Sequence, residues 1–196
     1  MKLYQAPASP YARKVIMCAH ELDLLSKIEL KLTSPQSEET YGKINPIHRI
    51  PALELDDGLV LFDSRVICEY LDSIGGNKLF PASGLGRFRV LKLQAMGDGL
   101  CDAAVPRRQE TLRAPERQSK EFLASRERMI RQICDAWEGT VEQLQGVNIG
   151  TLAVAAALGY LDFRFPGDEW RKGRPKLAKW HEEFAKRPAY QATIPA

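Results

Sequence analysis

Short apolar runs and helical repeats alternate along the first third of the chain. Residues 2–5 form a brief strand-like run, and apolar positions then recur at helical spacing as far as Leu22. Ser9 is a favourable N-cap residue, and Pro10 is favoured at the first helical position. Residues 28–32 alternate apolar and charged side chains, which is typical of a half-buried strand. The pattern predicts a strand, a helix and a second strand.

A hairpin and another helix follow a polar, turn-rich segment at residues 33–45, which favours at most one irregular helix. Two apolar runs, 51–55 and 59–62, flank an Asp-Asp-Gly turn, a strong hairpin signal. Apolar residues recur at helical spacing over 66–74, and a pair of glycines then ends the helix. The order βαβ, irregular segment, ββα indicates an α/β module with a mixed sheet.

Beyond residue 85 the pattern is helical only. Helical repeats cover residues 87–112, 116–144, 149–165 and 175–186. Asn148 can cap the third helix, and Thr151 stands where an acidic residue would complete a capping box. We therefore expect an α/β domain over residues 1–77, a linker over 78–85 and an all-helical domain over 86–196.

Composition and charge exclude several classes of function. The formal net charge of +3 over 196 residues is too small by itself to indicate nucleic-acid binding. Four glutamates interrupt the arginines between Arg107 and Arg131, so we expect a solvated helix face there. The longest apolar stretch, residues 152–158, is too short to span a bilayer, and no signal peptide is visible. We expect a cytoplasmic protein that binds neither nucleic acid nor membrane.

The positions of the cysteines and histidines show whether disulfides or a metal site should be expected. The sequence contains four widely spaced cysteines, Cys18, Cys68, Cys101 and Cys134. They form no C-x-x-C motif, which favours reduced, mostly buried thiols over a disulfide framework. The three histidines form no H-E-x-x-H motif, so we expect no metal site and no metal role for His48.

The stretch from Ala8 to Val15 carries the most informative chemistry. A helix N-terminus concentrates unpaired N–H donors and partial positive charge, so an anion placed there is stabilised. The Ser9 hydroxyl can donate a hydrogen bond to a thiolate at this point, or it can serve only as the helix cap. The two roles are compatible, because the oxygen can accept while its hydrogen donates. Tyr4, inside the first strand, is interpreted as a core residue.

Four strings of residues occur in a characteristic order: 9–15, 45–53, 62–71 and 180–190. Together they resemble the cytosolic glutathione transferases, and the small bacterial YibF-type members in particular, over essentially the whole chain. The resemblance implies a thioredoxin-like N-terminal domain with a mixed four-stranded sheet, followed by an all-α domain. It also implies a homodimer with a role in detoxification, which uses glutathione as a co-substrate and needs no cofactor.

The resemblance assigns the catalytic role to Ser9. Thioredoxin-like redox proteins begin this helix with Cys-Pro-Tyr-Cys, whereas both sulfurs are absent from residues 9–12 here, so dithiol exchange cannot run. Lowering a thiol pKa from about 8.5 by about two units requires roughly 2.7 kcal/mol. One charge-assisted hydrogen bond supplies about 1.5–3 kcal/mol and the helix terminus about 0.3–1 kcal/mol, so no general base is needed.

The resemblance implies that the Ile50–Pro51 peptide bond is cis and exposes the Ile50 backbone. Its N–H and C=O would then pair with the cysteinyl part of glutathione as an added strand. Arg49 could hold the glycine carboxylate, and a solvated surface arginine is the alternative. His48 departs from the family pattern, which commonly has glycine there, and a positive φ at this position would strain a histidine.

The pair Asp63-Ser64 stands at the start of another predicted helix. The resemblance implies that the Ser64 hydroxyl and N–H bind the γ-glutamyl carboxylate, while Asp63 faces the ammonium group. The opposite charges are placed correctly for a zwitterion. The alternative is that Asp63 serves only as the N-cap of the helix.

In the family, the electrophile binds between the serine and the first helix of the helical domain. Gly97 and Gly99 in that predicted helix indicate a close approach or a bend. Asp98 and Asp102, one turn apart, could line a polar pocket or a dimer groove, or face solvent. No role follows from the sequence for the arginines at 107 and 108.

The expected function is that of a glutathione transferase, an enzyme in which Ser9 stabilises the thiolate and the sulfur attacks a small electrophile. A non-catalytic glutathione- or partner-binding protein of the same fold is the alternative. A glutathione-dependent isomerase or peroxidase would share the site. A cysteine-based lyase or reductase is disfavoured, because a serine stands where its sulfur would be.

Overall fold

A four-stranded sheet forms the first part of the computed structural model, which describes residues 1–34 and 38–195. Its strands are β1 (Lys2–Gln5), β2 (Glu29–Leu32), β3 (Ala52–Glu54) and β4 (Val60–Leu61). Strand β1 pairs parallel with β2 and antiparallel with β3, which pairs antiparallel with β4. The spatial order is β2-β1-β3-β4. The mixed four-stranded sheet expected from the sequence is therefore confirmed.

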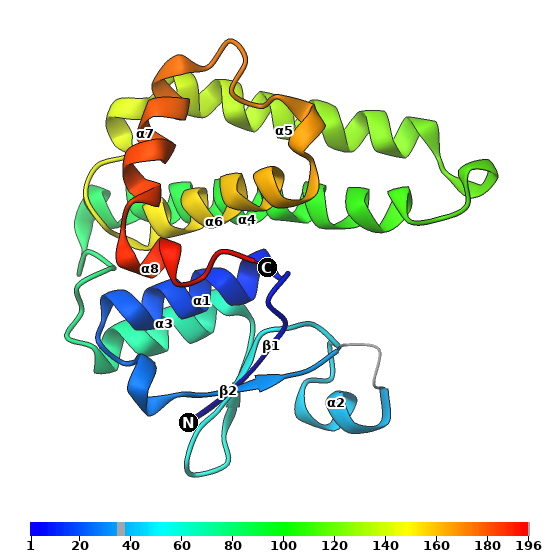
Figure 1. The fold of residues 1–196 in the computed structure, drawn as a ribbon. Helices are drawn as coiled ribbons and strands as arrows, with labels where there is room; N and C mark the ends of the chain where they lie inside the picture. Colours follow the sequence, from blue (N-terminus) through cyan, green and yellow to red (C-terminus); the bar gives the residue numbers. More distant parts are fainter. Residues whose placement is uncertain (35–37, 196) are drawn as a thin grey trace. The chain divides into compact units, whose positions relative to one another are not determined.

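Helices α1 (Pro10–Glu21) and α3 (Ser64–Ile74) pack against each other on the sheet (Figure 1). Helix α1 is the crossover between the parallel strands β1 and β2, and α3 follows the β3–β4 hairpin. Leu3 of β1, Leu53 of β3 and Ile67 of α3 are fully buried. The apolar faces that the sequence pattern predicts thus meet in one core.

The polar segment between β2 and β3 contains one short helix, α2 (Glu38–Ile44). This agrees with the single irregular helix expected within residues 33–45. Residues 35–37 of that segment lie outside the described part of the chain.

The rest of the chain is helical. The helices are α4 (Gly84–Thr111), α5 (Lys120–Gly139), α6 (Ile149–Arg164), α7 (Pro175–Ala185) and the short α8 (Pro188–Gln191). Every residue of α6 from Ile149 to Leu161 is buried, as expected for a helix that is apolar on all sides. Among the described residues, no helix is long and apolar enough to cross a membrane.

A reciprocal cap begins α6. The Asn148 Oδ1 atom accepts a hydrogen bond from the Thr151 N–H at 3.0 Å, and the Thr151 hydroxyl accepts one from the Asn148 N–H at 3.0 Å. The threonine hydroxyl therefore does what an acidic side chain does in a standard capping box. The cap expected at Asn148 is confirmed. The threonine at position 151 completes the capping box in place of an acidic residue.

By internal contacts, the chain divides into two compact units. The first unit contains residues 1–90 together with the C-terminal tail (residues 188–195), and the second contains Leu91–Arg187. The boundary between the units falls inside α4. The predicted linker at 78–85 lies entirely within the first unit. The Asp72 carboxylate attaches its start to α3, since it accepts hydrogen bonds from the N–H groups of Leu79 and Phe80. The domain boundaries expected from the sequence stay a prediction.

The C-terminal tail packs along α1, as Figure 1 shows for the red and blue segments. Arg13 of α1 is 4% exposed. Its guanidinium donates to the Tyr190 carbonyl and to the Thr193 hydroxyl, each at 3.2 Å, and lies 4.1 Å from the centre of the Tyr190 ring. A charged side chain on the outer face of α1 thereby fixes the tail.

Candidate functional site

Three of the predicted site segments meet at one end of the sheet. The register pairs Tyr4 of β1 with Ala52 of β3, and Leu53 of β3 with Leu61 of β4. The carboxyl ends of β1 and β4 therefore lie beside the amino end of β3. Ser9 follows β1, Pro51 precedes β3 and Asp63 follows β4. The N-termini of α1 and α3 are brought to the same end of the sheet by these short connections.

Ser9 is the N-cap of α1. Its Oγ atom accepts a hydrogen bond from the Ala12 N–H at 3.3 Å, and Pro10 occupies the first helical position. The side chain is half-buried. Because the cap uses an oxygen lone pair, the hydroxyl hydrogen remains able to donate to an anion. The capping role expected from the sequence is confirmed, and it leaves the thiolate-binding role chemically possible.

The Ile50–Pro51 peptide bond is cis, as the resemblance implied. Within residues 1–34 and 38–195, neither the N–H nor the C=O of Ile50 is hydrogen-bonded to another residue. Both groups lie directly before β3, so an extended ligand can pair with them as an additional strand.

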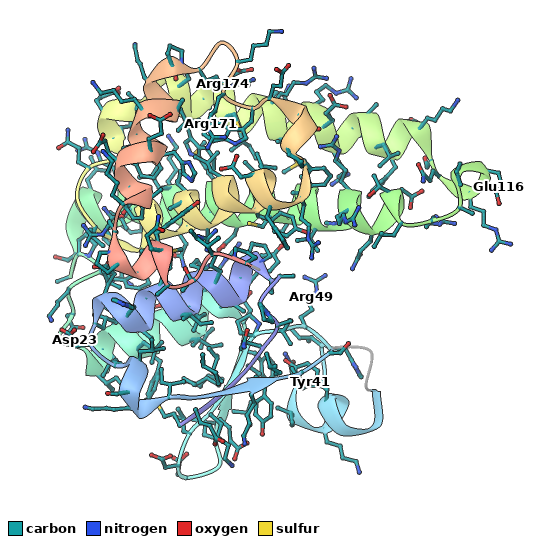
Figure 2. All side chains as sticks on the ribbon, in the orientation of Figure 1. Asp23, Tyr41, Arg49, Glu116, Arg171 and Arg174 are labelled. Carbon is teal, nitrogen blue, oxygen red and sulfur yellow. The ribbon has the colours of Figure 1, made fainter. Side chains whose placement is uncertain are left out.

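A buried asparagine holds the loop before Pro51. Asn45 is fully buried, and its Nδ2 donates to the Arg49 carbonyl at 2.6 Å while its Oδ1 accepts from the Ile47 N–H at 3.1 Å. The Tyr41 hydroxyl donates to the same Arg49 carbonyl at 2.8 Å. Figure 2 labels Tyr41 and Arg49. Burial raises the pKa of Tyr41, which keeps this hydroxyl protonated. Sequence reasoning missed Asn45 and Tyr41, although the Asn-Pro dipeptide at 45–46 is a turn signal.

His48 and Arg49 occupy the exposed side of this loop. His48 has φ 51°, in the left-handed region that glycine occupies most easily. Its ring lies against Gly42, where a Cβ atom would stand 2.7 Å from the His48 Cε1 atom. The Arg49 side chain is exposed, and its guanidinium is hydrogen-bonded to no other described residue. It is thus available to an anionic ligand, as the sequence prediction requires, while the solvated alternative stays open.

Asp63 and Ser64 begin α3. Asp63 is the N-cap, and its Oδ1 atom accepts a hydrogen bond from the Arg65 N–H at 2.9 Å. The N-cap role of Asp63 is therefore confirmed, and its exposed carboxylate leaves the ligand-binding role a prediction. Ser64 is 2% exposed, and no described residue is hydrogen-bonded to its hydroxyl. A carboxylate at this helix N-terminus would meet that hydroxyl and the unpaired N–H groups of the first turn.

Tyr4 differs from its interpretation as a core residue. It is only half-buried, and its hydroxyl donates to Glu54 Oε2 at 2.6 Å. This hydrogen bond, together with burial, raises the pKa of Tyr4. The hydroxyl is therefore committed to a carboxylate of the neighbouring strand rather than to a thiol.

All four cysteines are free and buried, as the sequence analysis predicts. The pKa of Cys18 is raised by its hydrogen bond to Cys68 and by burial. Burial likewise raises the pKa of Cys134 to about 12. The raised pKa values keep the Cys18 and Cys134 thiols protonated at neutral pH, which makes both poor nucleophiles. Within residues 1–34 and 38–195, no cluster of histidine, cysteine or acidic side chains could hold a metal ion.

The polar residues of α4 that the sequence singled out lie in the second unit. Asp98 is 4% exposed, whereas Asp102 is exposed, so the solvent-facing alternative holds for Asp102 only. Gly97 approaches the backbone of Ala153 closely, which confirms one of the two reasons proposed for glycine there. Arg107 forms an ion pair with Asp168.

These features define a thioredoxin-like domain with a cis-proline loop, followed by a helical domain. Residues 3–78 match the family model described as glutathione S-transferase, N-terminal domain. The whole chain is 30% identical to the uncharacterized GST-like protein YibF of Escherichia coli (strain K12), of which it covers 98%. The chain therefore belongs to the glutathione S-transferase family.

Solved structures agree with this assignment. A glutathione transferase family member from Pseudomonas fluorescens Pf-5, crystallised with bound glutathione, is 42% identical and has a TM-score of 0.96. The superposition covers 100% of this chain and 98% of that one. A further structure from that strain, with bound S-(propanoic acid)-glutathione, is also 42% identical, with a TM-score of 0.92 and complete coverage of both chains.

Proposed function

We propose that the protein is a glutathione transferase that binds glutathione at the end of the sheet formed by β1, β3 and β4. The backbone groups of Ile50, which pair with no other described residue, are the observation that carries this proposal, because they can pair with an extended cysteinyl residue. Ser64 and Asp63 would receive the charged γ-glutamyl end, and Arg49 the glycine carboxylate. The relatives from Pseudomonas with glutathione and a glutathione conjugate bound support this choice of ligand.

The proposed reaction begins with loss of the thiol proton of glutathione to solvent. The Ser9 hydroxyl would donate a hydrogen bond to the sulfur anion, and the N-terminus of α1 would add its partial positive charge. The sulfur then forms a bond to an electrophilic carbon, and a leaving group such as halide departs with its electron pair. Every step uses residues of the chain and glutathione as co-substrate, so no bound cofactor is needed.

The test is to replace Ser9 by alanine and to follow conjugation of glutathione to 1-chloro-2,4-dinitrobenzene. Loss of one charge-assisted hydrogen bond of about 1.5–3 kcal/mol should lower kcat/KM about 10- to 150-fold and raise the pKa of the bound thiol. Ser26→Ala, at an exposed position between α1 and β2, is the control. Unchanged turnover together with an unchanged thiol titration would remove Ser9 from catalysis.

A non-catalytic protein of the same fold is the second candidate, and binding measurements separate it from the first. Titration calorimetry with glutathione should show saturable binding that Arg49→Ala weakens. A partner-binding scaffold would show no heat of binding. If the protein binds glutathione but conjugates no electrophile, assays of glutathione-dependent isomerisation and of hydroperoxide reduction separate an isomerase or peroxidase from a non-catalytic binding protein.

We also propose that the protein is a cytoplasmic homodimer with a role in detoxification. Exposed apolar side chains on the first turns of α4 support a dimer, since Leu85 is 65% and Phe88 is 64% exposed. Neighbouring α3 is joined to this segment by the ion pair between Glu69 and Arg87. Phe88→Lys should convert a dimer to a monomer in sedimentation experiments, whereas Leu112→Lys, at an equally exposed position of the second unit, should not.

A further inference from the structure

The peptide group between Arg49 and Ile50 is held through its carbonyl oxygen. This oxygen accepts two hydrogen bonds, one from Asn45 Nδ2 at 2.6 Å and one from the Tyr41 hydroxyl at 2.8 Å. A carbonyl oxygen has two lone pairs, so the two donors meet its full bonding capacity. Asn45 is fully buried and Tyr41 is 1% exposed. The Arg49 carbonyl therefore faces buried side chains of the first unit.

The orientation of this carbonyl also sets the direction of the Ile50 N–H. The Arg49–Ile50 peptide bond is trans, and in a planar trans peptide the C=O and the N–H point in opposite directions. The Ile50 N–H thus points away from Tyr41 and Asn45, and it donates to no described residue. Because Arg49 is exposed and Ile50 is half-buried, this N–H lies on the outer side of the loop.

A reversed peptide group would oppose binding of an extended ligand. Such a ligand presents a carbonyl of its own to the Ile50 N–H. If the peptide plane were reversed, the Arg49 carbonyl would stand in the place of this N–H, and two acceptors would face each other. Reversal would also leave the Tyr41 hydroxyl and the Asn45 amide as buried donors without an acceptor, which is unfavourable. The two donors therefore favour the orientation that can bind the ligand.

The ring of Tyr41 is supported by the sheet. It meets the ring of Tyr4 edge-on, with 6.3 Å between the ring centroids and 61° between the planes. Tyr4 belongs to β1, and its hydroxyl donates to Glu54 Oε2 of β3 at 2.6 Å. The Tyr41 hydroxyl thus reaches the loop from a side chain that rests on two paired strands, which is what a positioning contact requires.

We propose, on the basis of the function proposed above, that Tyr41 is a positioning residue for glutathione. Its hydroxyl holds the Arg49–Ile50 peptide so that the Ile50 N–H faces the cysteinyl carbonyl of the ligand. Tyr41 touches neither the ligand nor the sulfur. It contributes to the affinity for glutathione and leaves the chemical step at Ser9 unchanged.

The test compares Tyr41→Phe with Tyr4→Phe. Each substitution removes one tyrosine hydroxyl and retains the ring, but only the first removes a donor from the Arg49 carbonyl. In calorimetry, Tyr41→Phe should bind glutathione about 3- to 10-fold more weakly than the unaltered chain, and Tyr4→Phe equally well. At saturating glutathione, kcat with 1-chloro-2,4-dinitrobenzene should be the same in all three proteins. Equal affinities of the two variants, or a lower kcat in Tyr41→Phe alone, would overturn the proposal.

The ligand-free chain supplies a second readout, which a purely stabilising role of Tyr41 would not change. With one donor removed, the peptide plane should sample both orientations within microseconds to milliseconds. Nitrogen relaxation dispersion should then appear at Ile50 in Tyr41→Phe and not in Tyr4→Phe. An Ile50 amide without exchange in Tyr41→Phe would contradict the positioning role, even if that variant were less stable.

The two proposals fail in different ways. An unaltered chain that binds no glutathione would overturn the proposed function and the role of Tyr41 with it. Glutathione binding by the unaltered chain that Tyr41→Phe leaves unchanged would overturn the role of Tyr41 alone.

Discussion

Asn45 is the residue whose side chain holds the loop before Pro51 in place. In Asn45→Asp, a carboxylate oxygen would replace the Nδ2 group and face the Arg49 carbonyl, so two acceptors would oppose each other. We expect the free energy of unfolding to fall by about 1–3 kcal/mol at neutral pH. Urea unfolding followed by circular dichroism measures the change.

Asn77→Asp is the matched control for this prediction. Asn77 is exposed and has φ 55°, a conformation that aspartate also tolerates. Its substitution should change the free energy of unfolding by less than about 0.5 kcal/mol. Equal effects of the two substitutions would show that the Asn45 hydrogen bonds do not stabilise the loop.

Local signals explain which site residues could be predicted. A helix cap depends on the few residues that follow it, so Ser9, Asp63 and Asn148 were identifiable from the sequence as caps. The contribution of Tyr41 could not be predicted in this way. Its partner is a backbone carbonyl whose position depends on the path of a loop, and no periodic pattern encodes that path.

At the scale of the element, replacing Gly97 or Gly99 of α4 by alanine should have opposite effects on the stability of the protein. A Cβ atom at Gly97 would stand 2.7 Å from the backbone carbon of Ala153, which cannot move aside, whereas one at Gly99 would meet only Met129 Cε at 4.0 Å. Gly97→Ala should therefore destabilise the protein by about 1–3 kcal/mol through overpacking. Gly99→Ala should stabilise it by about 0.5–1 kcal/mol through helix propensity.

Thermal and urea unfolding of both variants test this difference. Each substitution adds the same methyl group to the same helix, so each serves as the control for the other. Stabilisation by Gly97→Ala would mean that α4 and α6 do not approach as closely as the structure shows.

A second prediction for the elements concerns the contact between α1 and the C-terminal tail. In Arg13→Met, the tail would lose both hydrogen bonds and the ring contact with Tyr190. We expect amide exchange of residues 190–194 to accelerate at least tenfold, because the tail would detach without global unfolding. Arg89→Met, at an exposed position of α4, should leave exchange of the tail unchanged. Identical exchange in the two variants would contradict an anchoring role for Arg13.

At the scale of the whole molecule, Asp162 contributes to the dependence of stability on pH. Burial alone would raise its pKa, but hydrogen bonds from Arg171 and Trp170 outweigh burial and lower it. A carboxyl group with a lowered pKa in the folded state stabilises the fold above the unfolded pKa, about 3.9. This contribution is lost as the pH falls through the lower pKa of the folded state.

We expect Asp162→Asn to reduce the free energy of unfolding by about 2 kcal/mol at pH 7, and the difference from the unaltered chain to shrink below about pH 4. Urea unfolding at pH 7, 5 and 3 measures both effects. The exposed residue Asp23, labelled with Arg171 in Figure 2, supplies the control Asp23→Asn, which should show neither. A difference that is constant over this pH range would exclude the carboxylate as its source.

Most of the architecture was predictable, because strands, helices and turns in this chain carry strong local patterns. The mixed sheet, the hairpin and the four long helices all appear close to their expected positions. The return of the C-terminal tail to the first unit was not predictable. It depends on Arg13 meeting a backbone carbonyl and a hydroxyl nearly 180 positions later, and charge patterns along the chain do not encode such a partner.

This return of the C-terminal tail has a consequence for biosynthesis. Residues 188–195 are translated after the whole second unit, so α1 acquires its last packing partner only when nearly 190 residues have been polymerised. Until then, the guanidinium of Arg13 lacks the Tyr190 carbonyl and the Thr193 hydroxyl that accept its hydrogen bonds in the folded chain. A nascent chain stalled before Pro188 therefore presents to chaperones and proteases a surface that the finished chain conceals.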